Sequence, residues 1–238
     1  MPAAFPDSLV VPLFPLPGIV LFPGCLLPLR IFEPRYCTML KDAMDSRRLI
    51  AMAHIRKAKD GAPGAEPGAT LAPPVVHEVL GVGSIVAHEP QADGTFNIAL
   101  LGQARCRIEE EVPHQIYRLV RVVTLHDEVP DTPELRTHLE RARQYLVAEA
   151  QRLISRTLVK EAAGQLKAVL REKQDAGAVA DLLTSVYVND PSLKQALLET
   201  LDVLKRTQLT TAMVVKILAG LEPKPPPSKY GGGDVSLN

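Results

Sequence analysis

Apolar and polar positions change their periodicity near His126, and this change divides the chain into two parts. Before His126, apolar residues form short runs or alternate with polar ones, a pattern that predicts strands. One early segment differs, because Glu33-Pro34 is typical of a helix start and Tyr36 begins an apolar series at helical spacing. The predicted strands lie at residues 9–14, 26–29, 49–55, 79–88, around 96–100 and 117–125.

After His126, apolar residues recur every three or four positions, which predicts helices. Thr132-Pro133 and Asp190-Pro191 each place an N-cap residue before a first-turn proline, and each therefore predicts a helix start. One apolar face of the first helix is expected to contain Leu135, Leu139, Ala142, Leu146, Ala150 and Leu153. Further helices are expected around residues 166–170, 179–186, 193–198 and 204–218.

These elements predict an α+β fold, because several short strands with one early helix favour a compact, partly closed β-barrel and the remainder favours a helical bundle. We expect a β domain at residues 8–126, a helical bundle at 131–221 and a flexible tail at 222–238. A loop rich in proline, glycine and alanine at residues 57–74 is expected to be mobile.

Charge, cysteine content and the first residues of the chain indicate which partners and which cellular location to expect. The 238 residues carry 27 basic and 27 acidic side chains, whereas a general nucleic-acid binder usually has a basic excess. The three cysteines show no paired spacing, so we expect free thiols in a reducing compartment. The first residues lack the basic and apolar regions of a signal peptide, and five prolines interrupt the most apolar stretch, residues 9–29. We therefore expect a soluble cytoplasmic protein with no membrane partner.

A search for catalytic motifs finds none in the sequence. The nucleophile elbow GxSxG, the zinc motif HExxH and the phosphate-binding loop GxxxxGK[ST] are all absent. Gly81-Val82-Gly83 is only a fragment of a dinucleotide fingerprint and is better interpreted as two strand glycines. No histidine pairs with a cysteine or a second histidine at ligand spacing. We expect neither enzymatic activity nor a cofactor or metal.

The segment VPLFPLPGIVLFPGCLLPLRIFEPRYCTML, residues 11–40, resembles the opening of the Lon protease N-terminal domain family. The main resemblance lies in residues 16–36. Further similar segments are VGSIV at 82–86, IALLGQARCRI at 98–108, ADLL at 180–183 and KQALLE at 194–199. The resemblance covers roughly residues 10–218, and the ordered series is more specific than any single motif.

This resemblance implies a PUA-like β-barrel followed by a helical bundle, and a role in recognising substrates. Neither the ATPase's Walker A motif nor the peptidase's serine motif is present. We therefore expect a stand-alone bacterial member that binds unfolded or specific polypeptides without catalysis and acts with an ATP-dependent protease in trans. RNA binding, implied by the PUA-like fold alone, and a scaffold for one dedicated protein partner remain alternatives, with the neutral charge disfavouring nucleic acid.

The predicted polypeptide-binding residues lie where a strand enters the first helix, and they are Arg30, Phe32, Glu33, Arg35 and Tyr36. Each has an alternative structural interpretation. The three charged residues could form ion pairs that join strand to helix, and the two aromatic residues could belong to the core.

Overall fold

A computed structural model describes residues 5–56 and 73–221 of the chain. Its strands are β1 (Ser8–Leu16), β2 (Leu26–Ile31), β3 (Leu49–His54), β4 (Val79–Pro90), β5 (Phe96–Val112) and β6 (Arg118–Leu125). Its helices are α1 (Pro34–Met44), α2 (Pro133–Thr157), α3 (Lys160–Glu172), α4 (Ala176–Tyr187), α5 (Pro191–Glu199) and α6 (Val203–Gly220). The tail predicted at 222–238 and nearly all of the loop predicted at 57–74 lie outside the described residues.

The six strands form a mixed sheet in the order β2-β5-β4-β3-β1-β6, and a further pairing of β5 with β6 closes it into a barrel. The pairing of β1 with β3 is parallel, and the others are antiparallel. The 17-residue strand β5 allows the closure, because its first part pairs with β2 and its last part pairs with β6. The expected α+β class is confirmed.

Two strand glycines bring a connecting segment into contact with the barrel wall. A Cβ atom on Gly81 would lie 2.0 Å from the carbonyl oxygen of Leu21, and one on Gly102 would lie 2.0 Å from that of Phe22. Only glycine permits this approach. Gly81 therefore lies in strand β4, as predicted, and not in a phosphate-binding loop.

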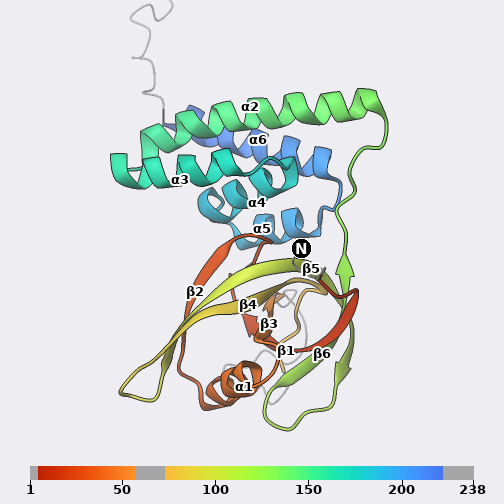
Figure 1. Cartoon of the computed structure of the whole chain (residues 1–238), viewed down its shortest axis with the longest axis vertical. Coiled ribbons are helices and arrows are strands. Elements are labelled where there is room, and N and C mark those ends of the chain that lie inside the picture. The colour runs from red at the N-terminus through yellow and green to blue at the C-terminus, as the bar shows by residue number, and fades with distance from the viewer. Residues whose placement is uncertain (1–4, 57–72, 222–238) are drawn as a thin grey trace, which may run out of the picture.

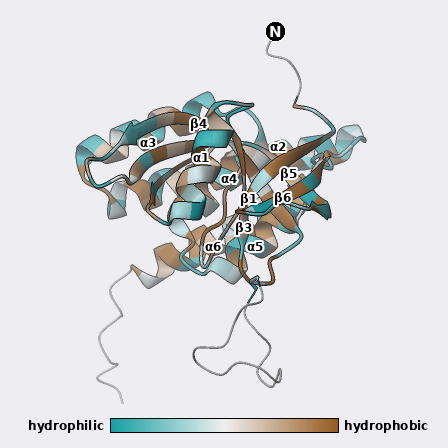
Figure 2. Cartoon of the chain, turned by 90° about the horizontal axis from the view of Figure 1, so that it is seen from below, coloured by the Kyte–Doolittle hydropathy of each residue, from teal (hydrophilic) through white to brown (hydrophobic). Residues whose placement is uncertain are grey.

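The helices occupy the two ends of the barrel (Figure 1). Helix α1 lies at one end, and Figure 2 shows it from that side. Helix α1 packs one face against an apolar core inside the barrel. The buried residues of this face have the helical spacing predicted from the sequence, and they are Tyr36, Met39, Leu40 and Ala43. Helices α2 to α6 form a bundle beyond the other end, with its own apolar core around Leu146, Leu153, Leu183 and Val214.

The barrel and the bundle meet through a small apolar cluster and several polar contacts. Phe22 and Cys25 pack with Leu197 and Leu198 of α5. Beside this cluster, the side-chain amide of Gln195 donates a 2.8 Å hydrogen bond to the carbonyl oxygen of Val79. The bundle therefore packs directly on the barrel.

Candidate functional site

The predicted site forms an elbow between β2 and α1, which we define as residues 30–36. Strand β2 ends at Ile31, and Glu33 then adopts an extended backbone as the N-cap of α1. Pro34 occupies the first turn of the helix, where the missing N–H removes no hydrogen bond. The change from strand to helix is therefore fixed by local chemistry.

The three charged residues of the elbow form ion pairs at the surface. Arg30 contacts Asp93 of the β4–β5 hairpin at 2.9 Å, and Arg35 contacts Glu33 at 2.8 Å. The guanidinium of Arg35 also lies 4.5 Å from the ring centre of Tyr36. The side chains of Arg30 and Arg35 are more than half exposed, so these pairs orient the side chains more than they stabilise the fold.

The two aromatic residues of the elbow differ sharply in exposure. Tyr36 is 6% exposed, and its ring packs 4.5 Å from that of Phe14. Burial raises the pKa of the Tyr36 phenol. Phe32, by contrast, is 66% exposed. Four predicted residues therefore lie together at the surface, while Tyr36 supports them from the core.

An open sheet edge and a shallow groove lie beside the elbow. Within the described part of the chain, β2 pairs with β5 alone, so its second edge is free. Leu26 on this strand is 62% exposed, and Pro28 is exposed as well. A groove of about 280 Å³ lies next to α1, with Met44, His88 and Phe96 among its lining residues. Phe96 on β5 pairs with Ile31 on β2, and Ile31 directly precedes Phe32 of the elbow.

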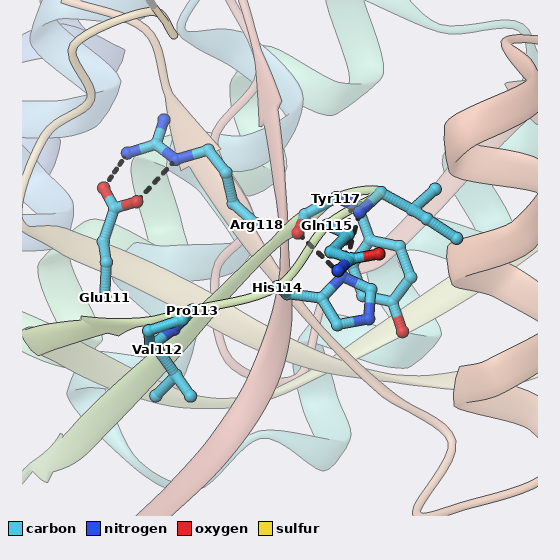
Figure 3. A pocket seen from close by; sticks show the side chains of 8 residues that line it. Glu111, Val112, Pro113, His114, Gln115, Tyr117 and Arg118 are labelled. Atoms are coloured by element: carbon cyan, nitrogen blue, oxygen red, sulfur yellow. Dashed lines mark hydrogen bonds and ion pairs between the residues drawn. The ribbon is translucent and has the colours of Figure 1, made fainter.

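A second, more polar pocket of about 430 Å³ is formed by residues 111–118, between β5 and β6 (Figure 3). Four of its polar side chains already have partners within the protein. Arg118 forms an ion pair with Glu111, and the Nδ1 atom of His114 lies 3.0 Å from the carbonyl oxygen of Tyr117. The Tyr117 hydroxyl donates a 2.8 Å hydrogen bond to Asp42 on α1. These contacts give the pocket a structural role.

Two features of the described residues bear on metal binding and on nucleophilic chemistry. These residues contain no group of histidine, cysteine or acidic side chains able to hold a metal ion. The ammonium of Lys167 donates a 2.7 Å hydrogen bond to the hydroxyl of Ser155, but the hydroxyl itself donates to the carbonyl oxygen of Gln151. No helix in residues 5–56 or 73–221 is both long and apolar enough to cross a bilayer.

One charge cluster was not predicted from the sequence: Arg105, Asp181 and Arg206 are buried, and Asp127 joins them from the surface. Alternation along β5 puts Arg105 on the face opposite the buried Cys106, which predicts an exposed side chain, yet Arg105 is only 4% exposed. Its guanidinium bonds to Asp181 and to the carbonyl oxygen of Leu198 because the bundle covers this part of the strand. Arg107, on the same strand face, remains exposed. The chemical type of these residues gave no signal of the cluster.

Comparison with known proteins identifies the family. The model described as the ATP-dependent protease La (LON) substrate-binding domain matches residues 10–216. The chain belongs to this family. Its solved neighbours include the N-terminal domain of the Lon protease of the Mycobacterium avium complex, with a TM-score of 0.63 and 18% identity over 87% of this chain and 98% of that one. The Lon N-terminal domain protein from Xanthomonas campestris gives a TM-score of 0.54 and 21% identity, over 86% and 98% of the two chains.

Curated relatives of this LON-family chain include several Lon proteases. The Lon protease of Methylocella silvestris is 28% identical over 90% of this chain and 24% of its own length. That of Dictyoglomus thermophilum is 27% identical over 90% of this chain and 25% of its own length. The chain thus spans about a quarter of the curated relatives that it matches. The resemblance inferred from residues 11–40 is confirmed.

Proposed function

We propose that this chain is a polypeptide-binding module without catalytic activity, and that the elbow is its contact surface. The observation that carries the proposal is Phe32, a large aromatic side chain that is 66% exposed. Neighbouring Tyr36 anchors the same elbow in the core at 6% exposure. An exposed aromatic residue on a well-supported backbone is typical of an interface anchor. The matching family model is named for substrate binding, and the substrate of a protease is a polypeptide.

The surroundings of Phe32 favour an extended ligand with apolar side chains. The free edge of β2 offers backbone groups for strand addition, and Leu26 adds apolar surface on the same strand. Pro28 lacks an N–H group and removes one donor, which limits pairing to a short segment. The groove at Met44 and Phe96 provides a place for a ligand side chain. We therefore expect affinity for short apolar stretches that only unfolded chains expose.

Binding can be tested with reduced, carboxymethylated α-lactalbumin labelled with fluorescein. Fluorescence anisotropy should show saturable binding, and Phe32→Ala should raise the Kd at least about tenfold if Phe32 is an anchor of the interface. Ile116→Ala is the matched control, because Ile116 is 53% exposed in the segment between β5 and β6, outside the elbow. Equal Kd values for the Phe32→Ala variant and the wild type would refute the assignment of the site.

We further propose that the chain delivers bound polypeptides to an ATP-dependent protease in trans. Its support is the relationship to one region of the Lon proteases. Added to a Lon protease from which the N-terminal domain has been deleted, the chain should accelerate degradation of the unfolded polypeptide. The Phe32→Ala variant should not. An unchanged degradation rate would count against action in trans and leave polypeptide binding itself standing.

A further inference from the structure

The apolar face of α2 extends beyond the core of the bundle. Leu135, Leu139, Ala142 and Leu146 follow one another at spacings of four, three and four residues and so lie in one row on the helix. Leu146 is fully buried, whereas Leu135 is 44% exposed. The row therefore leaves the core and reaches the surface within about three turns. Such an apolar row is typical of a helix face that packs against another element.

A shallow groove lies between this part of α2 and the neighbouring helix α6. Its volume is about 570 Å³ and most of its surface is apolar. Ala142 and Ala212 line it, and their small side chains would allow another helix to approach closely. Tyr145 also lines the groove and is 54% exposed. The groove is therefore shaped for side chains that enter from outside the bundle.

Arg141 gives the groove a cationic rim. This arginine lines the groove and is exposed, with no acidic partner among the described residues. The neighbouring carboxylate is already engaged, because Glu140 accepts hydrogen bonds from Arg143 and Gln144. The Arg143 guanidinium in particular lowers the pKa of Glu140 to about 2, so Glu140 keeps its charge in that pair. Arg141 therefore remains available to a carboxylate from a partner.

We propose that the groove between α2 and α6 binds an amphipathic helix of a partner protein, with aliphatic residues on one face and an acidic residue beside them. The aliphatic face would cover Ala142, Tyr145 and Ala212, and the acidic residue would pair with Arg141. Figure 1 places α2 and α6 in the part of the bundle away from α1 and the elbow. The chain could thus hold a polypeptide at one end while a partner docks at the other.

Two designed 18-residue peptides test the proposal. Both carry the same leucine row, and they differ only in having glutamate or lysine beside it. Added to the ¹⁵N-labelled full chain, the glutamate peptide should shift the amide resonances of residues 138–145 and 208–212, while the lysine peptide should bind at least tenfold more weakly. Arg141→Glu should reverse this preference. The Arg171→Glu variant, altered at an exposed position on α3, should behave like the wild type.

A second variant blocks the groove without removing the charge. Ala212→Arg should weaken binding of the glutamate peptide at least tenfold, whereas Ala168→Arg, at an exposed position on α3, should leave this binding unchanged. Phe32→Ala should also leave this binding unchanged, so failure at the elbow and failure at the groove are distinguishable. Equal binding of the two peptides, shifts confined to the elbow, or no shifts would overturn the proposal. Groove shifts that grow with protein concentration alone would instead assign the groove to a second copy of the chain.

Discussion

Arg105 on β5 and Asp181 on α4 form a hydrogen-bonded ion pair in which each side chain is only 3% exposed. The pair connects the barrel to the bundle. Arg206 of α6 lies beside it, with its Nε atom 3.3 Å from an Asp181 carboxylate oxygen, and also contacts Asp127. Two guanidinium groups and two carboxylates therefore form one cluster with balanced formal charges, and all of its members except Asp127 are buried. Such a cluster contributes to the fixed position of the bundle, because loss of a buried member leaves a buried charge without full compensation.

Asp181→Asn is expected to destabilise the chain by about 3–5 kcal/mol, since both neighbouring guanidinium groups would then lack a full counter-charge. Urea unfolding followed by circular dichroism measures this loss. Asp93→Asn is the matched control, because both side chains of the pair of Asp93 with Arg30 are more than half exposed, and its loss should be much smaller. Similar losses in the two variants would show that the buried cluster has no special role.

Two glycine-to-alanine substitutions should have opposite signs. Gly81→Ala is expected to cost about 3 kcal/mol or more, because its Cβ atom would lie 2.0 Å from the carbonyl oxygen of Leu21 and the backbone would have to move. Gly164→Ala should stabilise helix α3 by about 0.5–1 kcal/mol, since the new methyl group meets no atom within 4 Å beyond its chain neighbours and the backbone of its own helix, and alanine favours the helix. Thermal unfolding of both variants and the wild type measures these changes in stability. A Gly81→Ala protein as stable as the wild type would contradict the close contact.

The three cysteines should differ in reactivity. Cys25 and Cys106 are buried, and burial raises the pKa of both thiols, that of Cys106 to about 11. Cys37 is partly exposed. With Ellman's reagent at pH 8, we expect one thiol to react rapidly and two to react only as the protein unfolds. The rapid phase should disappear in the Cys37→Ser variant, and its persistence there would contradict this prediction.

Tyr117 should make the fold sensitive to alkaline pH. Burial, together with the hydrogen bond to Asp42, raises the pKa of its phenol from an ordinary value of 10 to about 12. The unfolded chain therefore loses this proton at lower pH than the folded chain does, so stability should fall as the pH rises from about 10 to about 12. Tyr117→Phe removes the titrating group and should flatten this part of the curve. The urea unfolding midpoints of the wild type and the Tyr117→Phe variant, measured between pH 9 and pH 11.5, test this difference. Parallel pH dependences of the two midpoints would contradict the prediction.

Local chemistry allowed much of the fold to be predicted from the sequence. Asp93-Gly94 is a typical hairpin sequence, and the turn between β4 and β5 forms there, with Gly94 at a positive φ of 81° that glycine adopts readily. Thr132 and Asp190 both cap their helices through side-chain oxygen atoms, as predicted. These features depend on residues close in sequence, so short patterns contain the necessary information.

Tertiary structure decided which residues of the elbow and of α2 reach the surface. Phe32 and Tyr36 were indistinguishable as core or contact residues from their types, and only the packing of Tyr36 against Phe14 separated them. Leu135 belongs to the same apolar row as Leu146, yet it lies beyond the part of α2 that the core of the bundle covers.

The sequence by itself determined the order of strands and helices, the turns and the caps, because each follows from spacing and side-chain chemistry within a few residues. Tertiary structure alone decided the burial of Arg105, the free edge of β2 and the exposed groove beside Ala212. Each of these depends on segments that are far apart along the chain. The same side chain is buried or exposed according to which distant element covers it, and no local pattern encodes that contact.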